Sequence, residues 1–208
     1  MQAFNEQLLN KKEEQKHNLI ETVVFFVLCI VLIFSCFYFF TYSIKEVVVS
    51  GPSMEKTLYN GDVLYLSVNK EVKIGDVVVI SGEKTNWVNG TAKDEWIIKR
   101  VIGLGGDTIE IKDGYVYRNG QKLEEDYKAY GPTAENDWKT KTLKDNEVFY
   151  LGDNRRVSAD SRSYFNTCTI DQIVGVVSNA SIKLKGISTF FYKNVKQPIL
   201  KMINGGVW

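Results

Sequence analysis

The chain opens with a long apolar run and then changes to short alternating segments. Residues 19–44 contain a single charged side chain, Glu21, at the edge of the run. A helix needs roughly 20 apolar residues to cross the hydrocarbon core of a bilayer. The run is apolar on every face, which argues against a half-buried helix of a soluble protein. It is also longer than the roughly 7 to 15 apolar residues of a cleavable secretory signal. We therefore predict one transmembrane helix over residues 19–44.

Beyond the apolar run, short stretches of β-branched and aromatic residues alternate with turn dipeptides. Such stretches, roughly four to eight residues long, are typical of strands. The clearest lie at 46–49, 62–66, 76–80 and 95–102. The pattern predicts an all-β domain after the helix.

Glycine dipeptides mark the expected turns of this domain. Asn60-Gly61, Asp113-Gly114 and Asn119-Gly120 are strong signals of tight hairpins. The last two predict a three-stranded meander over residues 108–123. The polar segment 81–95 is expected to be a loop.

Charge limits the partners and suggests the orientation. Lysine plus arginine number 26 and aspartate plus glutamate 25, so the chain carries no basic footprint for nucleic acid. Lys11, Lys12 and Lys16 precede the apolar run. Positive charge on this short side predicts that residues 1–18 are cytoplasmic. Residues 45–208 then lie outside the cell membrane.

Histidine and cysteine are scarce where chemistry is expected. The sole histidine, His17, precedes the apolar run, so residues 45–208 contain no imidazole. A Ser-His-Asp triad therefore cannot form there, nor can a zinc site rich in His and Cys. Cys168 is the only thiol in that part, which excludes an intradomain disulfide and leaves an exposed thiol free to pair between molecules. Any nucleophile in this domain needs another base, for which a lysine is the best candidate.

Two stretches supply a candidate nucleophile and base. Ser53 follows Gly51-Pro52 just outside the apolar run, although Gly-Pro also begins many plain turns. Strand alternation places Ile97, Lys99 and Val101 on one face. Branched apolar neighbours desolvate an ammonium, which lowers its pKa. The alternative for Lys99 is an edge-strand lysine that only prevents aggregation.

A third polar stretch runs from Gly152 to Arg162. Ser158, Asp160 and Arg162 alternate along it, so an extended backbone would place all three on one side as a hydrogen-bonded and ionic brace. The alternative is a solvated surface turn.

In this combination the chain resembles the type I signal peptidases of bacteria, in the single-span form of Gram-positive organisms. The family motifs stand, in order, at Ser50-Gly51-Pro52-Ser53-Met54 with Thr57-Leu58, at Gly75 to Val78, at Lys99 to Gly103 with Gly106-Asp107, and at Gly152 to Arg162. The resemblance implies an antiparallel β-sheet or barrel domain over residues 45–208, behind the span at 19–44. It also implies a serine endopeptidase that acts on signal peptides of exported preproteins, without metal or cofactor.

The resemblance assigns roles residue by residue. Ser53 matches the nucleophile, with its backbone N–H in the oxyanion hole, and Lys99 matches the general base. Ser158 would orient the lysine amine, and Asp160 would hold the surrounding loops together with Arg162 and Arg100. Asp153 and Asn154 would support the same loops. The apolar grooves for substrate side chains would be lined by Met54, Leu58, Val49, Ile97 and Ile98.

The chain departs from the family pattern at three positions, and three other functions are considered for its motifs. Relatives commonly have proline at Lys56 and Gly105 and glycine at Asn166; Gly105 is expected to loosen the turn after Lys99. Lys56 also creates the Ser-x-x-Lys spacing of penicillin-binding proteins and β-lactamases, but no Lys-Thr-Gly follows. A non-catalytic assembly factor for surface structures such as pili is a further alternative, as is a self-cleaving Ser/Lys repressor. Residues 183–208 are expected to form a last strand and frayed tail, or to touch the membrane surface.

Overall fold

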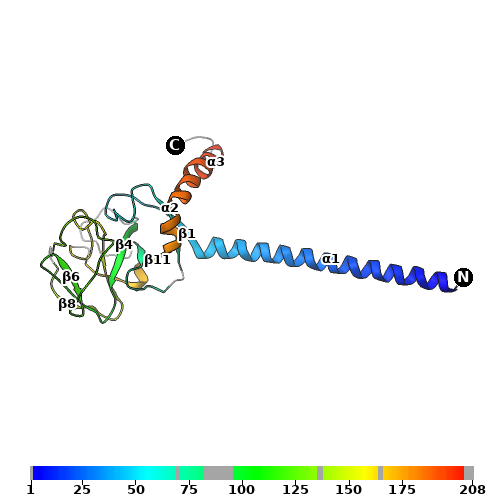
Figure 1. Cartoon of the computed structure of the whole chain (residues 1–208), viewed down its shortest axis with the longest axis horizontal. Helices are drawn as coiled ribbons and strands as arrows, with labels where there is room; N and C mark the ends of the chain where they lie inside the picture. The colour runs from blue at the N-terminus through cyan, green and yellow to red at the C-terminus, as the bar shows by residue number, and fades with distance from the viewer. Residues whose placement is uncertain (1, 69–70, 82–95, 135–137, 164–165, 204–208) are drawn as a thin grey trace. The chain divides into compact units, whose positions relative to one another are not determined.

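In the computed structural model the described residues are 2–68, 71–81, 96–134, 138–163 and 166–203. The chain divides into two compact units, residues 1–43 and 44–208. The first is one α-helix, α1 (Gln2–Ser43), within which Glu14–Cys36 is long and apolar enough to cross a membrane (Figure 1). The helix expected over residues 19–44 is thus part of a longer one that ends at Ser43. Most of the loop expected at 81–95 lies outside the described residues.

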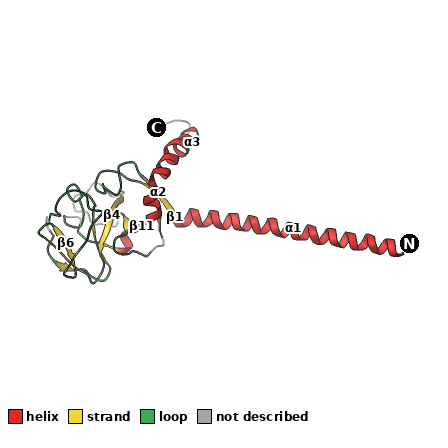
Figure 2. Cartoon of the chain, viewed as in Figure 1, coloured by secondary structure: helices red, strands yellow, loops and turns green. Residues whose placement is uncertain are grey.

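The second unit is built on two antiparallel sheets, seen as yellow strands in Figure 2. The larger sheet has the order β1-β2-β11-β3-β4-β9-β10. Its strands are β1 (Ile44–Val48), β2 (Val63–Ser67), β3 (Val77–Ser81), β4 (Trp96–Gly103), β9 (Glu147–Leu151), β10 (Cys168–Thr169) and β11 (Ile173–Val177). The smaller sheet has the order β7-β6-β5-β8, from β5 (Thr108–Lys112), β6 (Tyr115–Arg118), β7 (Gln121–Lys122) and β8 (Lys141–Thr142). The prediction of a mainly β, antiparallel domain is confirmed.

Turn chemistry explains the meander of β5, β6 and β7. Both central residues of each hairpin turn have positive φ: 51° and 80° at Asp113-Gly114, and 53° and 77° at Asn119-Gly120. That is the requirement of the type I′ turn, which matches the twist of paired strands. The prediction of a tight hairpin at Asn60-Gly61 was wrong. Only Gly61 has positive φ, and its turn closes the long connection from β1 to β2, where its N–H donates to Val49 O at 2.8 Å.

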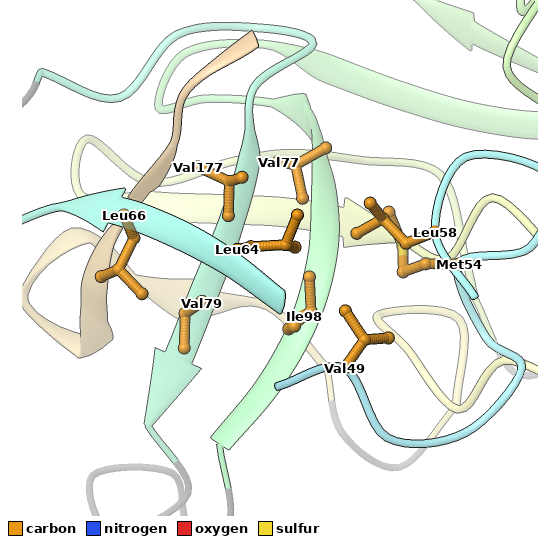
Figure 3. Packing of buried hydrophobic residues seen from close by; sticks show 9 residues of the cluster. All are labelled: Val49, Met54, Leu58, Leu64, Leu66, Val77, Val79, Ile98 and Val177. Atoms are coloured by element: carbon orange, nitrogen blue, oxygen red, sulfur yellow. The ribbon is translucent and has the colours of Figure 1, made fainter. Parts of the chain in front are cut away.

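The connection between β1 and β2 carries Ser53 and is fixed by its own apolar side chains. Val49, Met54 and Leu58 are buried in a cluster with residues of β2, β3, β4 and β11 (Figure 3). Fully burying a side chain such as Leu or Met contributes about 1.5–3 kcal/mol. Buried residues on both sides of Ser53 therefore hold the backbone of the serine against the sheet.

The C-terminal region is helical. After η1 (Ile170–Gln172) and β11, the chain forms α2 (Asn179–Phe191), the π-helical turn η2 (Tyr192–Lys196) and α3 (Gln197–Ile203). The side chain of Ser178 caps α2 by accepting a hydrogen bond from Ser181 N at 3.0 Å. The prediction of a last strand and frayed tail was therefore wrong for residues 183–203. The run Phe190-Phe191-Tyr192 is compatible with either a strand or a helix. The cap at Ser178 favours the helix.

Gly105 tightens its turn instead of loosening it. A Cβ built on Gly105 would lie 2.1 Å from the carbonyl oxygen of Asp145, far inside van der Waals contact. The turn after β4 thus passes close to the backbone that leads into β9. A residue with a side chain does not fit there unless the backbone moves.

We expect Gly105→Ala to lower the free energy of unfolding by about 1–3 kcal/mol, the usual cost of overpacking. The measurement is chemical unfolding of the full chain in detergent. Gly186→Ala in α2 is the matched control, because nothing lies within 4 Å of a Cβ there. That control should gain up to about 1 kcal/mol from helix propensity. Equal midpoints for Gly105→Ala and the wild type would contradict the close approach.

Candidate active site

Lys99 and Ser53 meet at the centre of the larger sheet. Lys99 Nζ donates to Ser53 Oγ at 3.0 Å and to the carbonyl oxygen of Ile98 at 2.9 Å. The lysine is 4% exposed, on a strand that pairs with β3 on one side and β9 on the other. The edge-strand alternative for Lys99 is therefore excluded. The structure brings the predicted nucleophile and base to hydrogen-bond distance.

Burial controls the charge of the lysine amine. Desolvation lowers the pKa of Lys99 from 10.5 to about 8, while the negative charges of Asp160 and Asp153 oppose the shift. About a tenth of the amine is then neutral near pH 7, against a negligible fraction at the ordinary pKa of lysine. Neutral Lys99 can accept a proton from the hydroxyl beside it.

Loop geometry presents Ser53 to the amine. Gly51 has φ 84°, and its N–H donates to Asn60 Oδ1 at 3.1 Å, so a left-handed residue starts the turn. The carbonyl oxygen of Ser53 accepts a hydrogen bond from Asn154 N at 3.0 Å. This stretch is therefore a turn, as one alternative expected, and the turn also places Ser53 beside the amine of Lys99.

Asp153 connects the serine loop to the strand of the base. Its carboxylate accepts two hydrogen bonds from Arg100, from Nε at 2.8 Å and from Nη2 at 2.6 Å. The same carboxylate accepts a hydrogen bond from the hydroxyl of Thr57. Asp153 is fully buried, so these contacts are shielded from solvent. One side chain therefore ties the loop of Ser53 to the neighbour of Lys99.

Asp160 forms a second, separate ion pair. Arg162 Nε donates to Asp160 Oδ1 at 2.8 Å, and Gly152 N donates to Asp160 Oδ2 at 3.0 Å. Arg162 also donates to the carbonyl oxygen of Arg155 at 2.8 Å. The predicted brace exists, but its segment is folded into turns and is not extended. Arg100, expected to act with Asp160, pairs with Asp153 instead.

Ser158 does not make its predicted contact with the lysine. Its hydroxyl is buried and has no hydrogen-bond partner among the described residues, and the same is true of Asn154 Oδ1. The second contact of the amine is instead with Ile98 O. A Cβ on Gly152 would lie 2.2 Å from Ser158 Oγ and 2.5 Å from Ser53 O, so only glycine fits between them.

A groove of about 310 Å³ opens beside the dyad. It is lined by Val47, Val48, Val49, Ser50, Ser53, Met54, Trp96, Ile97, Ile98 and Lys99. Four of the predicted substrate-binding residues line it, whereas Leu58 packs in the core of Figure 3 and does not. Sequence reasoning missed Val47, Val48, Ser50 and Trp96. Val47 and Val48 lie in β1 and Trp96 in β4, the strands next to the two motifs, and Ser50 is the first residue of the Ser53 motif; this proximity is the signal that could have found them.

Lys56 and Cys168 take no part in this site. Lys56 is exposed and donates to the carbonyl oxygen of Asp126 at 2.6 Å, which gives no support to a Ser-x-x-Lys arrangement. Cys168 is buried, and burial raises its thiol pKa to about 12, so it is neither a nucleophile nor open to pairing between molecules. Among the residues that the structure describes, no cluster of His, Cys, Asp and Glu could hold a metal ion.

Comparison with known proteins places the chain in a family. A family model described as "Signal peptidase, peptidase S26" matches residues 19–181. Signal peptidase I P of Bacillus subtilis subsp. natto is 31% identical over 183 residues, which cover 81% of this chain and 92% of the relative. The chain belongs to the signal peptidase family, peptidase S26.

Other signal peptidases are similar to parts of the chain. Signal peptidase I S of Bacillus subtilis (strain 168) is 36% identical over 143 residues, or 62% of this chain and 71% of the relative. The crystal structure of a signal peptidase I from Enterococcus faecalis is 29% identical with a TM-score of 0.41, and the match covers 52% of this chain and 98% of that one.

Further contacts of this signal peptidase family member lie in the insertion between β7 and β8. Glu125 forms a buried ion pair with Arg155, which also donates to Thr133 at 2.7 Å. The ring of Tyr127 lies 4.1 Å from the guanidinium carbon of Arg100. These contacts fasten the insertion to the catalytic loops. At the third departure from the family, Asn166 adopts φ 52°, a conformation that asparagine tolerates.

The lowered pKa of Lys99 predicts a pH-dependent cost to stability. Below about pH 8 the folded state holds a buried cation, whereas the unfolded chain titrates near 10.5. We expect Lys99→Met to raise the free energy of unfolding by about 3 kcal/mol at pH 6–7. The gain should disappear as pH rises from 8 to 10.5, because the wild-type amine is then neutral in both states.

The measurement is chemical unfolding of both proteins in detergent across this pH range. Lys56→Met is the control, since that exposed ammonium is solvated in the folded and the unfolded chain. A gain that stays constant with pH would contradict the assignment of a buried, titrating amine to Lys99.

Proposed function

We propose that this member of the signal peptidase family cleaves signal peptides from exported preproteins with Ser53 as nucleophile and Lys99 as general base. Family membership supplies the reaction class, that of a serine peptidase acting on signal peptides. The observation that carries the residue assignment is the 3.0 Å contact between Lys99 Nζ and Ser53 Oγ, with the lysine 4% exposed.

The chemistry follows from this pair. Neutral Lys99 takes the proton of Ser53 while Oγ attacks the scissile carbonyl, which forms a tetrahedral intermediate. The backbone N–H of Ser53 donates to the developing oxyanion. The proton on Lys99 then passes to the leaving amine, and an ester links the signal peptide to Ser53. A water that gives its proton to Lys99 hydrolyses this ester and restores the enzyme.

The groove selects the substrate by size and polarity. Val49, Met54, Ile97 and Ile98 make an apolar lining beside Ser53, which suits small side chains before the cut. β1 is the terminal strand of its sheet, so an extended peptide can pair with its free edge. The supporting roles fall to Arg100, Asp153, Asn154, Asp160 and Arg162, which hold the serine loop and the base in register.

Membrane attachment brings enzyme and substrate together. We assign residues 19–43 of α1 as the transmembrane segment, residues 1–18 to the cytoplasm and residues 44–208, which begin with β1, to the outer side of the cell membrane. Lys12 and Lys16 precede the span on its short side, as the positive-inside rule requires. Tethering raises the local concentration of the catalytic domain at the surface where signal peptides are embedded.

The test is cleavage of a purified precursor with an Ala-x-Ala site by the full chain in detergent. We expect Ser53→Ala and Lys99→Met to lose activity by at least about 10²-fold, since a positioned general base contributes about 10²–10⁴-fold. Lys56→Met should stay active. Loss in Lys56→Met with an active Lys99→Met would overturn the base assignment. A wild type that cuts no precursor would favour a dedicated or non-catalytic assembly factor.

The pH dependence tests the same assignment without mutation. Because only neutral Lys99 can act as base, kcat/KM should fall about tenfold per pH unit below the pKa of about 8 and level off above it. The profile is measured between pH 6 and 9.5 with one precursor, and precursor cleavage by trypsin over the same range checks that the substrate stays accessible. A flat profile would rule out an amine with this pKa as the base.

A further inference from the structure

The C-terminal arm, which comprises α2, η2 and α3, has an unusual charge. Residues 179–203 include five lysines and neither aspartate nor glutamate. The lysines are Lys183, Lys185, Lys193, Lys196 and Lys201. The rest of the chain, in contrast, carries a net charge of −4. This arm is therefore a local basic segment on a protein without a basic footprint elsewhere.

One face of α2 is fastened to the catalytic domain. Ser181 Oγ accepts a hydrogen bond from Tyr65 N at 2.7 Å, and Thr189 Oγ1 accepts one from Val63 N at 2.9 Å. Lys185 Nζ lies 2.9 Å from Asp62 Oδ2 and donates to Thr57 O at 2.7 Å. These contacts satisfy backbone groups of β2 and fix the rotation of the helix about its axis. They thereby decide which side chains point outward.

The outward face is apolar and uncovered. Ile187 is 59% exposed and Phe190 is 61% exposed, and no described element covers them. Most of the exposed apolar residues of the arm follow one another at intervals of three or four positions, as on one side of a helix: Leu184, Ile187, Phe190, Phe191, Val195, Ile199 and Leu200. Single exposed apolar residues are ordinary, but a continuous stripe marks an interaction surface.

The arm lies beside the strand where the chain enters the domain. Lys196 Nζ is 2.7 Å from Glu46 Oε1 of β1, and β1 begins at Ile44. Figure 1 shows α2, in orange, beginning near β1, with α3 beyond it. Since β1 directly follows α1 in the chain, it starts at the bilayer surface in an enzyme anchored by α1. The arm is then within reach of the same surface.

We propose that the C-terminal arm is an interfacial anchor that lies on an anionic bilayer. Leu184, Ile187, Phe190 and Phe191 would enter the boundary between headgroups and acyl chains, as in amphipathic membrane-surface helices. This proposal rests on the proposed function insofar as it takes α1 as a transmembrane segment. The anchor holds the groove beside Ser53 at a fixed orientation to the surface.

Charge favours lipid over a second copy of the chain as the occupant of this face. A symmetric dimer places the same patch of both copies together, so the lysines of one arm would face those of the other. Lys183 and Lys193 have no ion pair among the described residues, which leaves them available to lipid phosphates. An apolar stripe accompanied by two lysines without ion pairs, on a segment that has no carboxylate of its own, matches an anionic lipid surface.

The direct test measures membrane depth on the full chain. An environment-sensitive fluorophore is attached at Ile187→Cys in a protein with Cys29→Ser and Cys36→Ser, while the buried Cys168 stays. Lys139→Cys, an exposed site next to β8, is the matched control. The protein is reconstituted in phosphatidylcholine vesicles with and without phosphatidylglycerol. We expect the label at 187, and not that at 139, to shift to the blue and to be quenched by lipids that carry a headgroup nitroxide.

Charge and self-association are tested in the same vesicles. Lys183→Gln with Lys193→Gln should remove the difference between anionic and neutral vesicles. A label at 187 that stays aqueous in both lipids would overturn the proposal. So would a blue shift in detergent that grows with protein concentration, because that result identifies a second copy as the occupant.

The functional test separates this inference from the proposed function. Ile187→Ser with Phe190→Ser should cut a vesicle-embedded precursor several-fold more slowly than the wild type and a short soluble peptide at the same rate. Ile170→Ser, which changes a 47% exposed apolar residue outside the arm, is the control and should match the wild type on both. Equal loss on both substrates, or no loss on either, would contradict the anchor. Failure of the proposed function shows differently, as a wild type that cuts neither substrate.

Discussion

The amine of Lys99 is buried on an interior strand of the larger sheet, beside the hydroxyl of Ser53. The pKa of this amine depends on the charged side chains around it. Desolvation alone would push the pKa of the amine further down, and the carboxylates of Asp153 and Asp160 oppose it. Each carboxylate is in turn paired with an arginine, Arg100 or Arg162. Desolvation outweighs the attraction of the two carboxylates, and the pKa of the amine settles at about 8.

The same pairs also hold the geometry. Ser53 lies on a connection and Lys99 on a strand, so nothing local in sequence fixes the distance between them. Asp153 closes this gap by binding Thr57 on one side and Arg100 on the other. The backbone N–H of Asn154 holds the carbonyl oxygen of Ser53, which couples the loop after β9 to the proposed nucleophile. Electrostatic tuning and positioning are therefore performed by one set of residues, which is how a preorganised site keeps its precision.

The sequence predicted those features that depend on neighbouring residues alone. Asp113-Gly114 and Asn119-Gly120 predict their turns because few other residues adopt those φ values, and strand alternation correctly turns Lys99 inward. The absence of histidine after residue 44 pointed to a lysine base. Choice of ionic partner was not accessible in this way: Arg100 binds Asp153, and the expected role with Asp160 was wrong. That choice depends on how β4 and β9 are registered, which alternation does not specify.

The conformation of residues 183–203 was also not predictable from neighbouring residues. Phe190-Phe191-Tyr192 is compatible with a strand. The helix depends on Ser178 at its cap and on the hydrogen bonds that Ser181 and Thr189 accept from backbone N–H groups of β2, a strand far away in sequence. Once that face is fixed, the remaining apolar side chains have no place in the core. In the proposed membrane-anchored enzyme, a catalytic domain held only through the chain at Ile44 would rotate about this tether, and the groove would keep no fixed orientation to the surface. A second attachment removes that freedom before the substrate arrives, so less orientational entropy is lost when the signal peptide enters the groove.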